Sequence, residues 1–248
     1  MKFKVLVLHG YASNGPAFSK RLAALRNACR DVADFYFPVG PHHVQALPSA
    51  TNPEPGPIDP TLPIEKQPRA WWVREDNSEN YVGWNESVAE LREYFAAHGP
   101  FDGILGFSQG ASVSSTVAAT FEQPGVAPET SVPLQSAPLK FAIIVSGFVP
   151  REPNLSKLFD KPIELPSLHV IGREDAIVEP KSSEKLAKCF ANARVEFHDG
   201  GHFLPTPAPW RNFVRDYIAS FRPDSGVAWQ NVPGPNERTD IDAPKNRI

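Results

Sequence analysis

Short apolar runs that alternate with amphipathic stretches constrain the fold of this chain more than any other feature of its sequence. The runs are six to eight residues long and are mostly bounded by glycine or proline. Because they lack a strict polar–apolar alternation, they predict strands that are buried on both faces, as in a parallel sheet. The predicted strands cover 3–10, 32–38, 101–107, 140–147, 167–172 and 193–199.

The segments between these runs place apolar residues at helical spacing. Over 81–97, for example, one helix face carries Trp84, Val88, Leu91 and Phe95. Strands that alternate with helices predict an α/β fold, in which a mostly parallel sheet carries helices on both faces. The other predicted helices run from Pro16 to Cys29 and over 109–121, 180–191 and 208–221.

Length and composition fit one globular domain. The 248 residues suffice for a single large core, and 41% of them are hydrophobic. We expect one domain over 1–222 and a polar C-terminal tail over 223–248, punctuated by glycine and proline. A flexible terminus is the expected state of this tail, and Trp229 is its one candidate for docking on the domain.

Charge, cysteines and hydropathy exclude several classes of protein. A net charge of −3 argues against a nucleic-acid binder with a basic face. Cys29 and Cys189 form no disulfide framework and no zinc pattern, so they are expected to pack as small apolar residues in a reducing compartment. The apolar run 5–8 is too short for a secretory signal or a membrane span, and we expect a soluble, cytoplasmic protein.

A proline-rich stretch interrupts the alternation of strands and helices. Residues 38–68 hold nine of the 27 prolines and show neither a strand period nor a helix period. A loop of this length without periodic structure is usually functional or disordered. We interpret 38–80 as an insertion with lid-like character.

The stretch 101–115, FDGILGFSQGASVSS, places a serine between two glycines where a predicted strand gives way to a helix. Small residues at Gly106 and Gly110 leave room for a tight turn. A G-x-S-x-G pattern in this context is typical of a nucleophile elbow, which lifts the serine hydroxyl into the cleft above the sheet. The start of the helix also favours negative charge that develops there. Ser108 is therefore the candidate nucleophile.

A serine nucleophile needs a base that takes its proton and a carboxylate that orients the base. Asp175 follows the predicted strand 167–172, and His202 follows the predicted strand 193–199. Carboxyl ends of parallel strands meet at one edge of a sheet, where ligands bind. Ser108, Asp175 and His202 also have the chain order expected of such a triad.

Other residues compete for these roles. Glu174 is the alternative orienting acid, and Asp199 is a weaker one because the acid is expected after the preceding strand. His198 lies inside the last strand pattern rather than after it. His169 lies inside a buried strand, where a hydrogen-bonded core histidine is expected. The histidines of the proline-rich stretch, expected at the surface or along the cleft, are His42 and His43.

An acyl-transfer site also needs hydrogen-bond donors for the oxyanion. The backbone N–H of Gln109, directly after the serine, is the first candidate. The second is the backbone N–H of Tyr11, because His9 and Gly10 end the first predicted strand and glycine allows a tight turn there.

Six sequence blocks carry most of these features: LHGYASN at 8–14, RAWW at 69–72, GPFDGILGFSQGA at 99–111, IIVSGF at 143–148, IGREDAIV at 171–178 and GGHFLP at 200–205. Together they resemble the FSH family of serine hydrolases, a branch of the α/β-hydrolase superfamily. GFSQG alone also resembles acyl-protein thioesterases and carboxylesterases, whereas RAWW and the insertion before it favour FSH. The resemblance implies an α/β-hydrolase fold and a Ser108–Asp175–His202 triad, and it does not extend into the tail after Phe221.

The resemblance also implies an enzyme that cleaves a small-molecule carboxylic ester or thioester without a metal or an organic cofactor. Because relatives include lovastatin-type thioesterases, an alternative is a dedicated polyketide-pathway hydrolase that releases or trims a carrier-bound acyl chain. For that chain, Trp71, Trp72 and Trp84 would line a pocket; otherwise they pack under the cleft and anchor the insertion. A third interpretation, a non-catalytic binding protein on a hydrolase scaffold, would normally lack a triad member.

Overall fold

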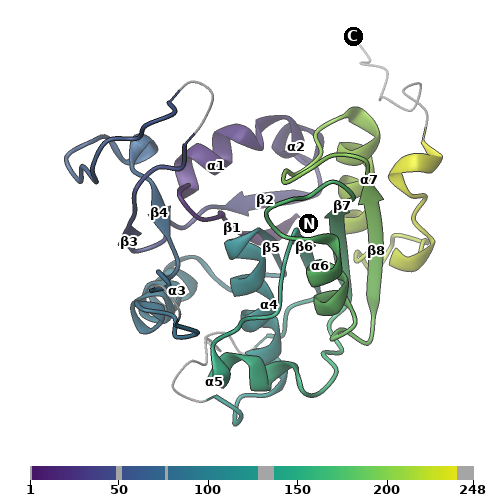
Figure 1. Cartoon of the computed structure of the whole chain (residues 1–248). Coiled ribbons are helices and arrows are strands. Elements are labelled where there is room, and N and C mark those ends of the chain that lie inside the picture. Colours follow the sequence, from purple (N-terminus) through teal and green to yellow (C-terminus); the bar gives the residue numbers. More distant parts are fainter. Residues whose placement is uncertain (1, 49–51, 76–77, 128–136, 239–248) are drawn as a thin grey trace.

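The computed structural model describes residues 2–48, 52–75, 78–127 and 137–238. At its centre lies a six-stranded sheet in which every neighbouring pair of strands is parallel (Figure 1). The α/β architecture expected from the alternating sequence is confirmed. In spatial order, the strands are Ala33–Tyr36 (β2), Phe3–Leu8 (β1), Gly103–Phe107 (β5), Phe141–Val145 (β6), Ser167–Gly172 (β7) and Ala193–His198 (β8).

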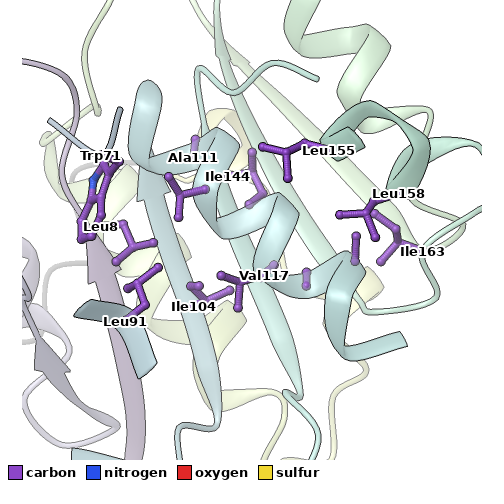
Figure 2. Close-up of a cluster of buried hydrophobic side chains, with 14 of the residues drawn as sticks. Leu8, Trp71, Leu91, Ile104, Ala111, Val117, Ile144, Leu155, Leu158 and Ile163 are labelled. Atoms are coloured by element: carbon purple, nitrogen blue, oxygen red, sulfur yellow. The ribbon is translucent and has the colours of Figure 1, made fainter. Parts of the chain in front are cut away.

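Helices cover both faces of the sheet (Figure 1): Gly15–Arg21 (α1), Ala23–Ala28 (α2) and Ala208–Ala219 (α7) on one, and Trp84–His98 (α3), Gln109–Glu122 (α4), Pro153–Ser156 (α5) and Pro180–Ala187 (α6) on the other. Val5 and Val7 of β1 belong to the core layer under α1, α2 and α7. Leu6 and Leu8 belong to the layer under α3, α4 and α6, which Figure 2 shows. Successive residues of one strand therefore supply both layers, which explains the continuous apolar runs.

The helix expected from Pro16 to Cys29 is interrupted. Leu22, with φ −88° and ψ 11°, closes α1 and opens α2. Leu22 and Leu25 still face the same core layer as Phe18. The apolar residues keep their helical spacing across this one-residue break. The spacing alone therefore does not reveal the break.

Within the insertion, two short strands pair with each other in antiparallel orientation: His42–His43 (β3) and Arg69–Ala70 (β4). The backbone N–H of Arg69 also donates to the carbonyl of Ser13, which attaches the end of the insertion to the loop after β1. Strands of two residues are too short to show a period, so the sequence does not predict them. The lid-like character of the insertion stays a prediction.

Residues 223–238 pack on the domain, and we call this segment the C-terminal strap. Trp229 stacks on Phe221 with 10° between the ring planes and meets the edge of Tyr217. The flexible terminus expected for the tail is therefore wrong for the strap, and the docking alternative for Trp229 is correct. The remainder of that tail, 239–248, lies outside the described residues.

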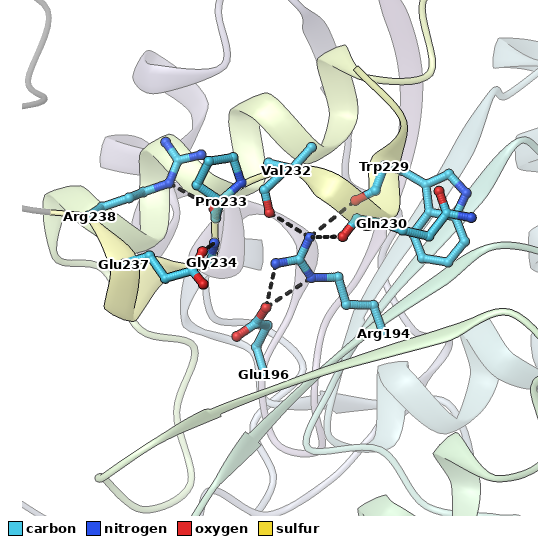
Figure 3. Close-up of polar contacts among 9 residues, drawn as sticks. All are labelled: Arg194, Glu196, Trp229, Gln230, Val232, Pro233, Gly234, Glu237 and Arg238. Carbon is cyan, nitrogen blue, oxygen red and sulfur yellow. Dashed lines mark hydrogen bonds and ion pairs between the residues drawn. The ribbon is translucent and has the colours of Figure 1, made fainter.

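Arg194 on β8 anchors the strap (Figure 3). Its guanidinium lies over the ring of Phe213 and is paired with Glu196 at 2.7 Å. The flexible tail is expected because the strap is polar, but backbone carbonyls of the strap have a partly buried cationic partner on the domain. The carbonyls that accept from Arg194 belong to Trp229, Gln230 and Val232.

Candidate active site

Three side chains that are far apart in the sequence meet at the carboxyl ends of the parallel strands. Ser108 follows β5, Asp175 lies in the loop after β7, and His202 lies in the loop after β8. Nε2 of His202 is 2.9 Å from Oγ of Ser108, and Nδ1 of His202 is 2.7 Å from Oδ2 of Asp175. The structure thus brings the three residues selected from the sequence into one hydrogen-bonded chain.

Ser108 occupies the tight turn between β5 and α4. Its backbone has φ 55° and ψ −118°, a conformation that costs free energy in a residue with a side chain. A methyl group on Gly106 would lie 2.3 Å from the carbonyl oxygen of Gly110, and one on Gly110 would lie 2.3 Å from the carbonyl oxygen of Leu8. Glycine at both positions lets α4 approach the sheet closely, and this packing holds the strained serine in place.

Asp175 is a buried carboxylate with a full set of partners. Its Oδ1 accepts the backbone N–H groups of Ile177 at 2.9 Å and Val178 at 2.8 Å. Burial raises the pKa of Asp175, but hydrogen bonds, first of all that from His202, bring the pKa below its usual value. The ionised carboxylate accepts Nδ1–H of His202, which leaves Nε2 free to accept from the Ser108 hydroxyl.

The competing acids and histidines make other contacts. Glu174 and Asp199 both have exposed side chains. His198 is buried against Phe203 and Trp210, and burial lowers its pKa. His169 hydrogen-bonds to Ser167 inside the sheet, and burial lowers its pKa to about 3, as expected for a neutral core histidine.

The two predicted oxyanion donors belong to segments beside Ser108, the first turn of α4 and the loop after β1. Gln109 is the first residue of α4, and the first amides of a helix have no acceptor within the helix. Gly10 brings the loop after β1 against the serine, because a methyl group on Gly10 would lie 3.3 Å from Cβ of Ser108. Tyr11 follows Gly10, is 39% exposed and lines the adjoining cleft.

A cleft of about 720 Å³ adjoins these loops. Trp72 and Tyr81 form one aromatic wall, with ring centroids 4.3 Å apart and 4° between the planes. Phe148, from the loop after β6, meets the edge of Trp72. The cleft therefore offers flat apolar surface together with charge. The charged residues in its lining are Arg74, Glu79, Arg151, Glu179 and Lys185.

Ser146 lies beside the site, although its sequence pattern does not predict it there. It follows β6, is 1% exposed and has a positive φ of 50°. Its hydroxyl makes no hydrogen bond of normal length within the described part of the chain, yet it lies close enough to Asp175 to lower the pKa of that carboxyl. The only available signal was its position at the end of a buried strand, in the block IIVSGF.

Known proteins resemble this chain in sequence over most of its length. A family model described as Serine hydrolase (FSH1) matches residues 1–214. Esterase OVCA2 of Homo sapiens is 34% identical over 229 residues, which cover 88% of this chain and 96% of that protein. Esterase CG5412 of Drosophila melanogaster is 33% identical over 232 residues, with 89% and 76% covered.

A protein called dihydrofolate reductase from Schizosaccharomyces pombe is also 34% identical, over 229 residues that cover 88% of this chain and 47% of that protein. This chain thus spans about half the length of that relative.

Solved structures share the fold. Acyl-protein thioesterase 2 of Zea mays aligns with a TM-score of 0.59 and 20% identity, over 89% of this chain and 94% of that one. Esterase PE8 aligns with a TM-score of 0.55 and 22% identity, over 89% and 93%. Identities this low show the fold alone, and the expected α/β-hydrolase fold is confirmed.

Proposed function

The chain belongs to the FSH1 family of serine hydrolases, and from this premise we propose that it hydrolyses carboxylic esters or thioesters through an acyl-enzyme on Ser108. The observation that carries the proposal is the hydrogen-bonded chain from Ser108 through His202 to Asp175. Each member has the position its role requires: a strained nucleophile, a base within reach of it, and a buried acid behind the base.

In the first step, Oγ of Ser108 attacks the carbonyl carbon while its proton passes to Nε2 of His202 over 2.9 Å. Asp175 accepts Nδ1–H and stabilises the imidazolium that forms. The backbone amides of Gln109 and Tyr11 hold the oxyanion. His202 then returns its proton to the departing alcohol or thiol.

In the second step, a water molecule takes the place of the leaving group. His202 removes one proton from this water as its oxygen attacks the acyl carbon. Collapse of the tetrahedral intermediate breaks the bond to Oγ of Ser108, which recovers the proton from His202. The products are a free acid and an unchanged enzyme.

Replacement of the nucleophile is the direct test. Ser108→Ala should abolish covalent labelling by a fluorophosphonate probe and lower p-nitrophenyl ester turnover by about 1000-fold or more. Ser225→Ala, which changes a partly exposed serine in the strap, is the matched control and should keep both. Undiminished ester turnover by Ser108→Ala would refute the assignment.

A second candidate function is release or trimming of a carrier-bound polyketide chain. It is favoured by the aromatic wall of Trp72 and Tyr81, which suits a flat or unsaturated chain. Of the three clustered tryptophans, Trp72 lines the cleft, whereas Trp71 and Trp84 are buried in the core. A higher kcat/KM for acyl thioesters of phosphopantetheine than for matched p-nitrophenyl esters would support this candidate; the reverse order would favour a general esterase.

The location that we propose is the cytoplasm, and the alternative to an enzyme is a binding protein. Within the described residues, no helix has the length and apolar character needed to cross a membrane. Cys29 and Cys189 are both free thiols, which supports the cytoplasm as the location we propose. Stoichiometric ligand binding without any turnover would instead favour a binding protein on this scaffold.

A further inference from the structure

One buried residue of the insertion contacts two segments beside the nucleophile, the first turn of α4 and the loop after β1. Trp71 is completely buried, and Figure 2 shows it at the margin of the core layer, next to Leu8 and Leu91. It comes directly after β4, in the block RAWW. Its backbone and its side chain each make a different connection.

The backbone of this segment is bonded to the side chain of Gln109. The N–H of Trp71 donates to Oε1 of Gln109 at 2.9 Å, and Nε2 of Gln109 donates to the carbonyl of Trp72 at 2.9 Å. The carboxamide of Gln109 therefore pairs with the chain at 71–72 through both of its polar atoms. Because Gln109 also carries the amide proposed to hold the oxyanion, this pairing fixes the first turn of α4.

The side chain of Trp71 is bonded to the loop after β1. Its indole N–H donates to the carbonyl of His9 at 2.9 Å, and its ring packs on the His9 imidazole. Nε2 of His9 accepts the N–H of Gly40 at 2.9 Å, so Nδ1 carries the proton and donates to the carbonyl of Gly10. Burial lowers the pKa of His9 to about 4, which keeps this arrangement neutral and fixed.

We propose that Trp71 is a positioning residue that sets the separation of the two oxyanion donors. Its backbone N–H bonds to Gln109, and its indole N–H bonds to the carbonyl of His9. The position of Trp71 therefore determines how far apart the backbone amides of Gln109 and Tyr11 lie. A third contact, from the hydroxyl of Ser87 on α3 to the Trp71 carbonyl, holds it from below. Donors act only within a narrow range of distance from the oxyanion, so a small displacement lowers the rate. The inference rests on the proposed function, since it requires an oxyanion at Ser108.

The test is Trp71→Phe, which keeps an aromatic ring and the backbone N–H but removes the indole N–H. We expect kcat for a p-nitrophenyl ester to fall about 10-fold, which is less than the loss of a whole donor, with KM changed less than about twofold. Affinity for a boronic acid, which forms a tetrahedral adduct with the serine, should fall by the same factor as kcat.

Trp84→Phe is the matched control. Trp84 is buried in the same core layer, and its indole N–H has no hydrogen-bond partner within the described residues. Both variants lose the same ring volume, but Trp71→Phe also leaves the buried carbonyl of His9 without its donor, so its Tm should fall further than that of Trp84→Phe. Only Trp71→Phe should lose kcat and boronic acid affinity; equal losses in the two variants would overturn the proposal.

A second variant keeps the proposal testable if Trp71→Phe does not fold. Gln109→Met removes both hydrogen bonds to 71–72 but keeps the backbone N–H of residue 109. It should show the same fall in kcat and in boronic acid affinity, and wild-type values would overturn the proposal. Failure of the proposed function is distinguishable, because Ser108→Ala would then keep its turnover whatever these variants do.

Discussion

Ser146 adopts a backbone conformation that favours glycine, although it carries a side chain. Its φ of 50° resembles that of Ser108, and both residues follow neighbouring parallel strands, β6 and β5. The backbone N–H of Ser146 donates to Val170 on β7, which places its hydroxyl on the side of Asp175. Such strain persists only where the surroundings enforce it. We interpret the hydroxyl of Ser146 as an additional donor that keeps Asp175 ionised.

This interpretation predicts the behaviour of two substitutions. Ser146→Ala and Ser146→Gly both remove the hydroxyl, so both should lower kcat about twofold, because a contact longer than a normal hydrogen bond contributes less than about 1 kcal/mol. The acid limb of the pH–rate profile should move to higher pH, because the hydroxyl lowers the pKa of Asp175 and its loss raises that pKa. Normal kcat in Ser146→Ala, which keeps the strained backbone and removes only the hydroxyl, would contradict this role.

At the residue scale, the sequence indicated the three clustered side chains better than the contacts that support them. Ser108, Asp175 and His202 could be selected because a strand, a turn and a side chain of the right type recur in a fixed order. The hydrogen-bond partners of His9 and the positive φ of Ser146 could not, because they depend on chain segments that meet only in three dimensions. Gln109 was selected for its backbone N–H, while its side-chain bonds to 71–72 had no sequence signal.

At the scale of elements, the strap depends on one side chain. Arg194 has a side chain only 15% exposed and donates to three carbonyls of the strap. Hydrogen bonds from a charged donor contribute more than neutral ones, and a single guanidinium makes all three of these bonds. Arg194 thus connects the edge strand β8 to a segment about 35 residues further along the chain.

We therefore predict that Arg194→Met lowers the free energy of unfolding by about 2 kcal/mol, measured by urea denaturation. Methionine keeps apolar contact with Phe213 but cannot donate. Arg173→Met is the control, since Arg173 also lies over a ring, that of Phe197, and its side chain is 58% exposed. The control should change stability by less than about 0.5 kcal/mol. Equal effects of the two substitutions would contradict the role given to Arg194.

The long elements were predictable because each carries its own period, and the short ones were not. The sheet strands and α3, α4 and α7 came from apolar spacing alone. β3 and β4 are two residues long, and the strap has no regular period, so tertiary contacts decide their conformation. No local sequence pattern predicts that Arg69 pairs with Ser13 or that Arg194 binds the strap, because these partners are far apart in the sequence.

At the scale of the whole molecule, buried neutral histidines make stability depend on pH. Burial lowers the pKa of His9 to about 4 and that of His169 to about 3. In the unfolded chain both regain a pKa near 6.5. Between these values the unfolded state binds protons that the folded state does not, so acid favours unfolding. Each histidine lowers stability by up to about 1.4 kcal/mol per pH unit as the pH falls from about 6 to about 4.

His169→Gln should reduce this slope by about that amount, because glutamine does not titrate. The measurement is the free energy of unfolding from urea denaturation at pH 6, 5 and 4, for the wild type and the variant. Carboxylates contribute equally to both proteins, and their effect cancels in the difference. Parallel pH dependences would mean that His169 is protonated in the folded protein.

The bonds at Gly40 and Trp71 have a practical consequence for hybrid enzymes. Gly40 and Trp71 anchor the insertion by hydrogen bonds to His9, which lies outside it. The insertion therefore cannot be exchanged as a self-contained segment. A chimaera with a foreign segment should have its junctions after Val44 and before Gln67, which leaves both anchors native. Junctions outside these limits would transplant half of a hydrogen-bonding pair and leave the recipient with the other half.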